Sequence, residues 1–243
     1  MRTHVRSMLR RRAWLPLVAG SLLLLAFAAP ALATGPPIDW DPAYGWQPGA
    51  SPQDMPLGGE FQMVGLVSKF DNPFQFLDAS DPTKEYTFYI HGLISQGTSS
   101  LGLPTQTVYT THYSGGTFDL YEGSPRNSSF TPNPPNADVP STFTDGTLLL
   151  HGDFTSFEII TNDFSIYQAG DIEGTLNWTG GTLLSETFGA LGVACPGLFM
   201  GGASWIAELV PQGYLVRHVG KIDINCPVPA RKSTWGQLKQ LYR

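Results

Sequence analysis

The sequence contains 243 residues, of which 42% are hydrophobic and 14% charged, and its 14 basic and 20 acidic residues give a formal net charge of -6 at pH 7. Five of the basic residues lie in residues 1–12 and four in residues 231–243, so the long middle of the chain holds five basic residues against all 20 acidic ones. A surface this negative repels nucleic acid and anionic lipid, so neither is an expected partner. The length suffices for one sizeable core, or at most two small ones.

Residues 1–33 have the pattern of an export signal. Five arginines and no acid precede the apolar run WLPLVAGSLLLLAFAAP, and Ala31-Leu32-Ala33 provides the small residues that signal peptidase requires. The alternative is an uncleaved membrane anchor, which the prolines and the small-residue site disfavour. We therefore expect export, to the extracellular space, the cell surface or the periplasm, and no membrane span in the mature protein.

Residues 34–58 are rich in proline and aromatic residues. This composition predicts an extended segment that lies against the body of the protein rather than a folded unit. Trp40 and Trp46 are the tryptophans that look free to meet a ligand, because other tryptophans fall on the apolar phase of expected strands. They are therefore the candidate ligand-binding residues of a carbohydrate-binding module, with a polysaccharide as the partner.

Residues 59–226 alternate apolar and polar positions and are punctuated by Gly, Asn and Asp. No stretch keeps apolar residues at helical spacing for long. The expected fold class is all-β, a single β-sandwich or barrel-like domain. The expected strands cover residues 61–70, 85–94, 105–113, 116–123, 146–154, 156–164, 171–179, 203–209 and 213–224.

The two cysteines, Cys195 and Cys226, are an even pair in a chain expected to enter an oxidising compartment. They predict one disulfide, which stabilises the fold by about 3 to 4 kcal/mol in the chain-entropy model. A reactive or metal-binding thiol pair is the alternative, but no histidine lies at metal-motif spacing from either cysteine.

Signs of enzymatic chemistry are sparse, and we expect a structural or binding protein rather than an enzyme. The four histidines after residue 33 lie on separate expected strands, and no nucleophile elbow, zinc-protease motif, P-loop or dinucleotide fingerprint is present. Asp171 and Glu173 are two positions apart on one expected strand, so they share a face as the carboxylate pair of a glycoside hydrolase does. They are the alternative catalytic residues.

Four acids in FDNPFQFLDASDPTKEY are the alternative metal ligands. Asp71, Asp78, Asp81 and Glu85 could supply hard oxygen ligands to calcium, although the regular Asp-x-Asp-x-Asp-Gly loop is absent. Solvated turn acids are the competing interpretation, so no cofactor is expected, with calcium as the possible exception.

Residues 227–243 form a cationic tail with helical spacing. Thr234 to Gln237 fit a capping box, which predicts a short C-terminal helix, too short to be stable alone. The apolar positions recur on one stripe and basic positions share another face. The residues expected to be recognised are Trp235, Leu238, Lys239, Leu241, Tyr242 and Arg243.

The ending STWGQLKQLYR resembles the Thr-Trp-Gly-x-aliphatic-Lys-x-Leu-Tyr-Arg endings of uncharacterised exported bacterial β-rich proteins. The resemblance covers about a twentieth of the chain and implies no activity. It implies a sorting or surface-attachment peptide, with the matching machinery as its partner. The alternative is a tail that docks on its own acidic body.

Overall fold

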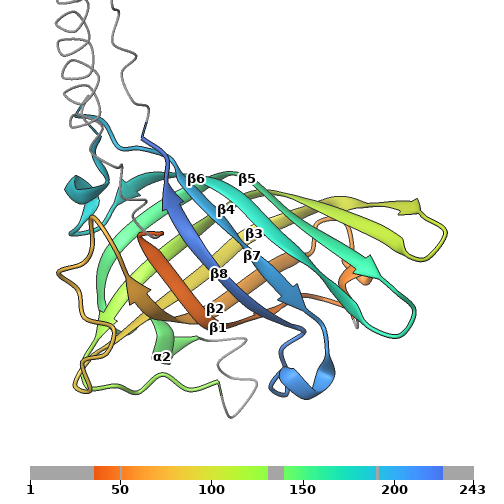
Figure 1. The fold of residues 1–243 in the computed structure, drawn as a ribbon, viewed down its shortest axis with the longest axis horizontal. Coiled ribbons are helices and arrows are strands. Elements are labelled where there is room, and N and C mark those ends of the chain that lie inside the picture. Colours follow the sequence, from red (N-terminus) through yellow and green to blue (C-terminus); the bar gives the residue numbers. More distant parts are fainter. Residues whose placement is uncertain (1–35, 50, 131–139, 190–191, 227–243) are drawn as a thin grey trace, which may run out of the picture. The chain divides into compact units, whose positions relative to one another are not determined.

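The computed structural model describes residues 36–49, 51–130, 140–189 and 192–226. The expected export signal and cationic tail lie outside these residues. Eight strands follow one another in chain order around a closed antiparallel barrel, in which β1 pairs with both β2 and β8 (Figure 1). The strands are β1 (Ile38–Trp46), β2 (Glu60–Phe70), β3 (Glu85–Gly102), β4 (Thr107–Gly123), β5 (Thr147–Asp163), β6 (Gln168–Gly180), β7 (Gly197–Ser204) and β8 (Val216–Ile224).

Short helical turns lie between some of these strands. They are η1 (Pro52–Asp54), α2 (Ser141–Thr144), η2 (Leu184–Thr187) and η3 (Ala207–Leu209). The all-β prediction is confirmed, and the fold is a closed barrel rather than a sandwich. No helix in the described ranges is both long and apolar enough to cross a membrane.

The first strand corrects the expected domain boundary. Ile38–Trp46, expected to lie outside the β domain, is the strand that closes the barrel. The register of β1 shifts between Trp40 and Ala43, across Asp41-Pro42, on both of its sides. A proline cannot donate a ladder hydrogen bond, so the irregularity lets this proline-containing segment serve as a strand. The β domain therefore begins at residue 38 rather than 59.

Aromatic side chains fill the middle of the barrel. Trp40 stacks on Phe199 at a centroid distance of 4.8 Å and meets Phe88 edge-on at 5.1 Å. Its indole N–H donates to His218 Nδ1 at 3.1 Å, and His218 in turn stacks on Phe199. Such interlocked rings bury large apolar areas in preferred geometries and stabilise the barrel from within.

Two glycines make room for these rings. A Cβ on Gly201 would lie 2.3 Å from the carbonyl oxygen of Val219 and 2.7 Å from His218 Nε2. A Cβ on Gly220, the cross-strand partner of Gly201, would lie 2.7 Å from His218 and 2.9 Å from Trp40. Small residues at these inward positions thus permit large rings beside them.

A second apolar cluster covers part of the outer wall. Val64, Phe143 and Tyr214 are buried there, so α2 and the segment around Tyr214 pack over β1 to β3. Thr87 Oγ1 donates to the carbonyl of Phe143 at 2.8 Å. The remaining wall, over β4 to β8, carries polar and charged side chains, among them His112, Glu158 and Glu173.

Candidate binding groove on the outer wall

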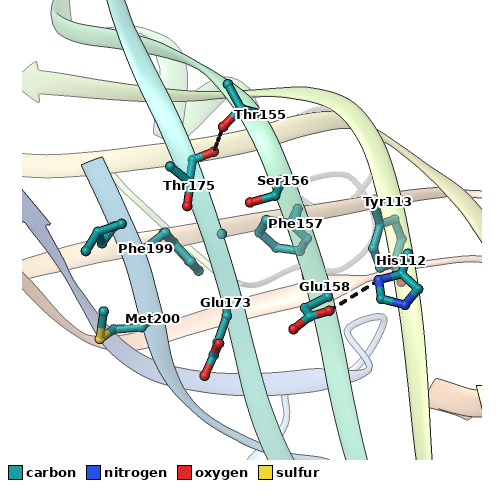
Figure 2. A pocket seen from close by; sticks show the side chains of 12 residues that line it. His112, Tyr113, Thr155, Ser156, Phe157, Glu158, Glu173, Thr175, Phe199 and Met200 are labelled. Atoms are coloured by element: carbon teal, nitrogen blue, oxygen red, sulfur yellow. Dashed lines mark hydrogen bonds and ion pairs between the residues drawn. The ribbon is translucent and has the colours of Figure 1, made fainter. Parts of the chain in front are cut away.

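A row of outward side chains crosses seven strands in register. Alternation along each strand sends their neighbours, among them Phe157, Ile172 and Phe199, into the core, so this row faces outward. Figure 2 shows four of its members side by side on adjacent strands. From β4 through β8 and on to β2 the row reads His112, Glu158, Glu173, Met200, Lys221, Asp39 and Lys69.

Two adjoining hollows lie along this row. The first has a volume of about 470 Å³ and extends over β4 to β7. The second has a volume of about 550 Å³ and extends over β6 to β8, β1 and one residue of β2. Glu173 and Met200 line both, so we call the combined surface the outer groove. The outer groove is long enough to contact an extended ligand rather than a single ion.

An outward glycine helps to form the second hollow. Gly202 on β7 stands between Asp171 on β6 and Val219 on β8, its cross-strand partners. A Cβ at Gly202 would meet nothing within 4 Å. The wall is therefore open at this point, with a carboxylate on one side and an apolar side chain, 39% exposed, on the other.

Negative charge concentrates at the centre of the outer groove. Glu158 and Glu173 are directly opposite each other on β5 and β6, an arrangement of like charges that destabilises a sheet. His112 Nδ1 lies 3.2 Å from Glu158 Oε2. Within the described residues, Glu173 and Asp171 have neither an ion pair nor a side-chain hydrogen bond. These carboxylates are thus available to a ligand.

The cations on the β8 and β1 side already have partners. Lys221 Nζ lies 3.1 Å from Asp223 Oδ2, and Arg217 contacts Asp41. Burial raises the pKa of Asp39, and the nearby lysines only partly offset this effect. The basic side chains at this rim therefore leave the charge of the central carboxylates largely uncompensated.

A separate polar cluster lies on the wall of β3 to β5. Asp119, with 9% of its side chain exposed, contacts His91 Nε2 at 3.3 Å and also His151 Nδ1. Thr117 Oγ1 lies 3.0 Å from the same His91 Nε2. Burial raises the pKa of Asp119, but the hydrogen bonds from the two histidines outweigh it, and the pKa is lowered overall.

This cluster is not a catalytic triad. In a hydrolytic triad the nucleophile and the carboxylate contact opposite nitrogens of the histidine, whereas here Thr117 and Asp119 share Nε2 of His91. The sequence predicts separate histidines, each on its own strand. The register of β3, β4 and β5 brings two of them to one carboxylate.

The tryptophans expected to bind a ligand are not free platforms. Trp40 is 1% exposed and lies inside the barrel, so its assignment to a ligand-binding surface is wrong. Trp46 is partly buried against the outer apolar cluster, with its ring stacked on Tyr89 at 6.4 Å and edge-on to Tyr214 at 5.6 Å. The prediction is wrong because Ile38–Trp46 is a strand of the barrel, and its alternation turns Trp40 inward.

Asp171 and Glu173, expected as the alternative catalytic residues, are both exposed, and both line the second hollow. Asp171 and Glu173 do share a face of β6, as their spacing predicted. Glu158 was not among the predicted site residues, because it is brought beside Glu173 only by the pairing of β5 with β6.

The four acids expected as calcium ligands have separate local partners. Asp71 pairs with a neighbouring lysine, and Asp78 and Asp81 each accept hydrogen bonds from the residue two positions further on. Glu85 is buried and accepts three hydrogen bonds from residues 127–128. In the part of the chain that the structure describes, no three His, Cys, Asp or Glu side chains gather to hold a metal.

The predicted disulfide is confirmed. Cys195 and Cys226 are bonded, with their Cα atoms 4.7 Å apart. The residues expected to be recognised in the tail lie outside the described residues.

Comparison of the chain with protein-family models, with curated proteins and with solved structures gives no match. The geometry of the outer wall is therefore the basis for assigning a function.

Proposed function

We propose that this protein is an exported binding protein, acting at or beyond the cell surface, whose outer groove binds a ligand with positive charge along its length. A basic peptide or polyamine is the chemical class that fits. The observation that carries the proposal is the direct opposition of Glu158 and Glu173, with Asp171 beside them, in a groove whose cations are paired elsewhere. A bound cation would relieve the repulsion that the sheet otherwise retains.

The size and shape of the groove also support a ligand with more than one charge. The carboxylates lie on successive strands, and neighbouring strands are about 4.8 Å apart. A chain with basic groups at intervals can contact Glu158 and Glu173 at once, with Met200 providing an apolar contact between the two hollows.

A polysaccharide is less well supported as the ligand. Sugar-binding sites present exposed aromatic rings, but the rings nearest the outer groove, Tyr113, Phe157 and Phe199, are at most 6% exposed. Hydrolysis by Asp171 and Glu173 also lacks a supporting feature, because both carboxylates face solvent, whereas the general acid of a glycosidase usually lies in apolar surroundings.

A binding measurement tests the proposal. Decalysine should bind the purified protein in isothermal titration calorimetry, and raising the salt concentration should weaken binding because exposed charges are screened. The double variant E158Q/E173Q should lose about tenfold or more in affinity. The matched control E186Q/E208Q removes two exposed charges outside the groove and should change the affinity by less than about twofold.

Two results would contradict the proposal. One is the absence of decalysine binding at low salt. The other is an equal loss of affinity in both double variants, which would mean that net charge, and not the outer groove, attracts the ligand.

A further inference from the structure

From the outer groove and the sequence that follows the barrel, we infer that the groove's ligand is the chain's own C-terminal segment, residues 231–243. This inference rests on the proposed function and names the partner of the same site. The segment would occupy the groove of its own barrel and be displaced by competing basic ligands.

Charge complementarity is the first reason. Residues 231–243 contain four basic residues, Arg231, Lys232, Lys239 and Arg243, and no acid. The centre of the groove has carboxylates without basic partners within the described residues, as shown above for Asp171 and Glu173. Oppositely charged surfaces on one chain attract each other without the entropy cost of bringing two molecules together.

Apolar complementarity is the second reason. At helical spacing, Trp235, Leu238 and Leu241 follow one another at intervals of three residues and fall on one side of the segment. The groove offers matching apolar surface beside its acids. It consists of Met200, the open position at Gly202 and the partly exposed Val219.

Reach is the third reason. The last described residue, Cys226, is bonded to Cys195, so the exit point of the segment is anchored to the barrel. Lys221, on the rim of the groove, precedes Cys226 by five residues, about 16 Å along a strand. Arg231 follows Cys226 by five residues, which span up to about 17 Å when extended. The basic segment can therefore return to the rim from which β8 leads away.

Competition in the full chain tests the inference. If the segment occupies the groove, the full chain carrying K239Q/R243Q should bind decalysine about tenfold more tightly than the unaltered chain, because an intramolecular competitor has been weakened. The matched control K84Q/R126Q removes two cations from the body outside the groove and should leave the affinity within about twofold.

A second measurement locates the contact. A fluorescent peptide with the sequence RKSTWGQLKQLYR should bind K239Q/R243Q, and adding E158Q/E173Q should weaken this binding about tenfold. An unchanged affinity of the peptide after the addition of E158Q/E173Q would overturn the inference, because the segment would then contact another surface.

The outcomes separate the two proposals. Decalysine binding at the groove without peptide binding, or with unchanged affinity in K239Q/R243Q, overturns the inference and leaves the proposed function standing. In that case the ligand of the groove is an external basic molecule, and sorting or surface attachment remains the proposed role of the segment. Failure of both ligands to bind overturns both proposals.

Discussion

His218 lies inside the barrel with 0% of its surface exposed, and its Nδ1 accepts the indole hydrogen of Trp40. The neutral ring therefore carries its proton on Nε2. Burial lowers the pKa of His218 from 6.5 to about 4, and the nearby backbone of Gly201 offsets only part of this effect. Protonation would place a charge in the aromatic core and remove the acceptor of the Trp40 hydrogen bond, so the free energy of unfolding should depend on pH.

The direction and the size of this pH dependence follow from the thermodynamic linkage between protonation and unfolding. Above pH 6.5 the histidine is neutral in both states and its contribution is complete. Between pH 6.5 and about pH 4 the unfolded chain takes up a proton that the folded protein excludes. The free energy of unfolding therefore decreases as the pH is lowered through this range. At 1.36 kcal/mol per pH unit, the loss attributable to His218 over this window is about 3 kcal/mol.

Urea unfolding followed by tryptophan fluorescence, with the disulfide intact, measures this loss at pH 4.5 to 7.5. The variant His218→Asn should be less stable at every pH, because it leaves a cavity. Its stability should nevertheless fall less steeply between pH 6.5 and 4.5, by up to one proton's worth of slope. Ile222→Ala, a buried truncation without a titrating group, should be destabilised but keep the parental slope. An unchanged slope in His218→Asn would mean that His218 is not the group whose protonation destabilises the fold.

Three further predictions concern stability. Replacing Cys195 and Cys226 by serine should lower the free energy of unfolding by about 3 to 4 kcal/mol, because the closed loop spans 31 residues, and an unchanged urea midpoint would contradict this. Gly201→Ala should destabilise by about 1 to 3 kcal/mol because its Cβ meets backbone, whereas Gly202→Ala, which meets nothing within 4 Å, should not; equal urea midpoints would contradict this. Asp119→Asn should destabilise by about 2 kcal/mol at pH 7 and reduce the loss of stability below pH 4, since the pKa of Asp119 is lowered in the folded protein and its contribution fades as the carboxylate protonates; identical pH profiles of urea unfolding would contradict this.

Much of the β content was predictable because alternation is a local signal, but strand boundaries were not. The expected strands 105–113 and 116–123 form the single strand β4, and 146–154 and 156–164 form β5. The adjacent glycines Gly115 and Gly116 predict a turn between two strands. In the structure both have positive φ but lie within one continuous strand. Whether a glycine bends a strand or ends it depends on the partner strand, which the local sequence does not reveal.

The misplacement of β7 has a similar cause. The strand was expected at 203–209, but it runs over Gly197–Ser204, and part of the expected range forms η3 instead. Its glycines weaken the local strand signal. Two of them make room for rings on the paired strands: a Cβ on Gly197 would lie 3.0 Å from Trp178 on β6, and one on Gly201 would lie 2.7 Å from His218 Nε2 on β8.

The candidate site was likewise only partly predictable from the sequence. The shared face of Asp171 and Glu173 follows from a spacing of two along one strand. The opposition of Glu158 and Glu173 follows only from the register of β5 with β6, which includes a shift between Phe154 and Ser156. Because a shift of one residue turns every side chain to the other face, such a site cannot be assembled without the register.

The measurement closest to the central claim is chemical-shift mapping of the isotope-labelled protein during titration with decalysine. We expect the largest amide shifts on the outer groove, at Glu158, Glu173 and Met200 on three adjacent strands, and we expect them to disappear in E158Q/E173Q. Shifts spread evenly over the acidic surface, or centred on the cluster around Asp119, would contradict it.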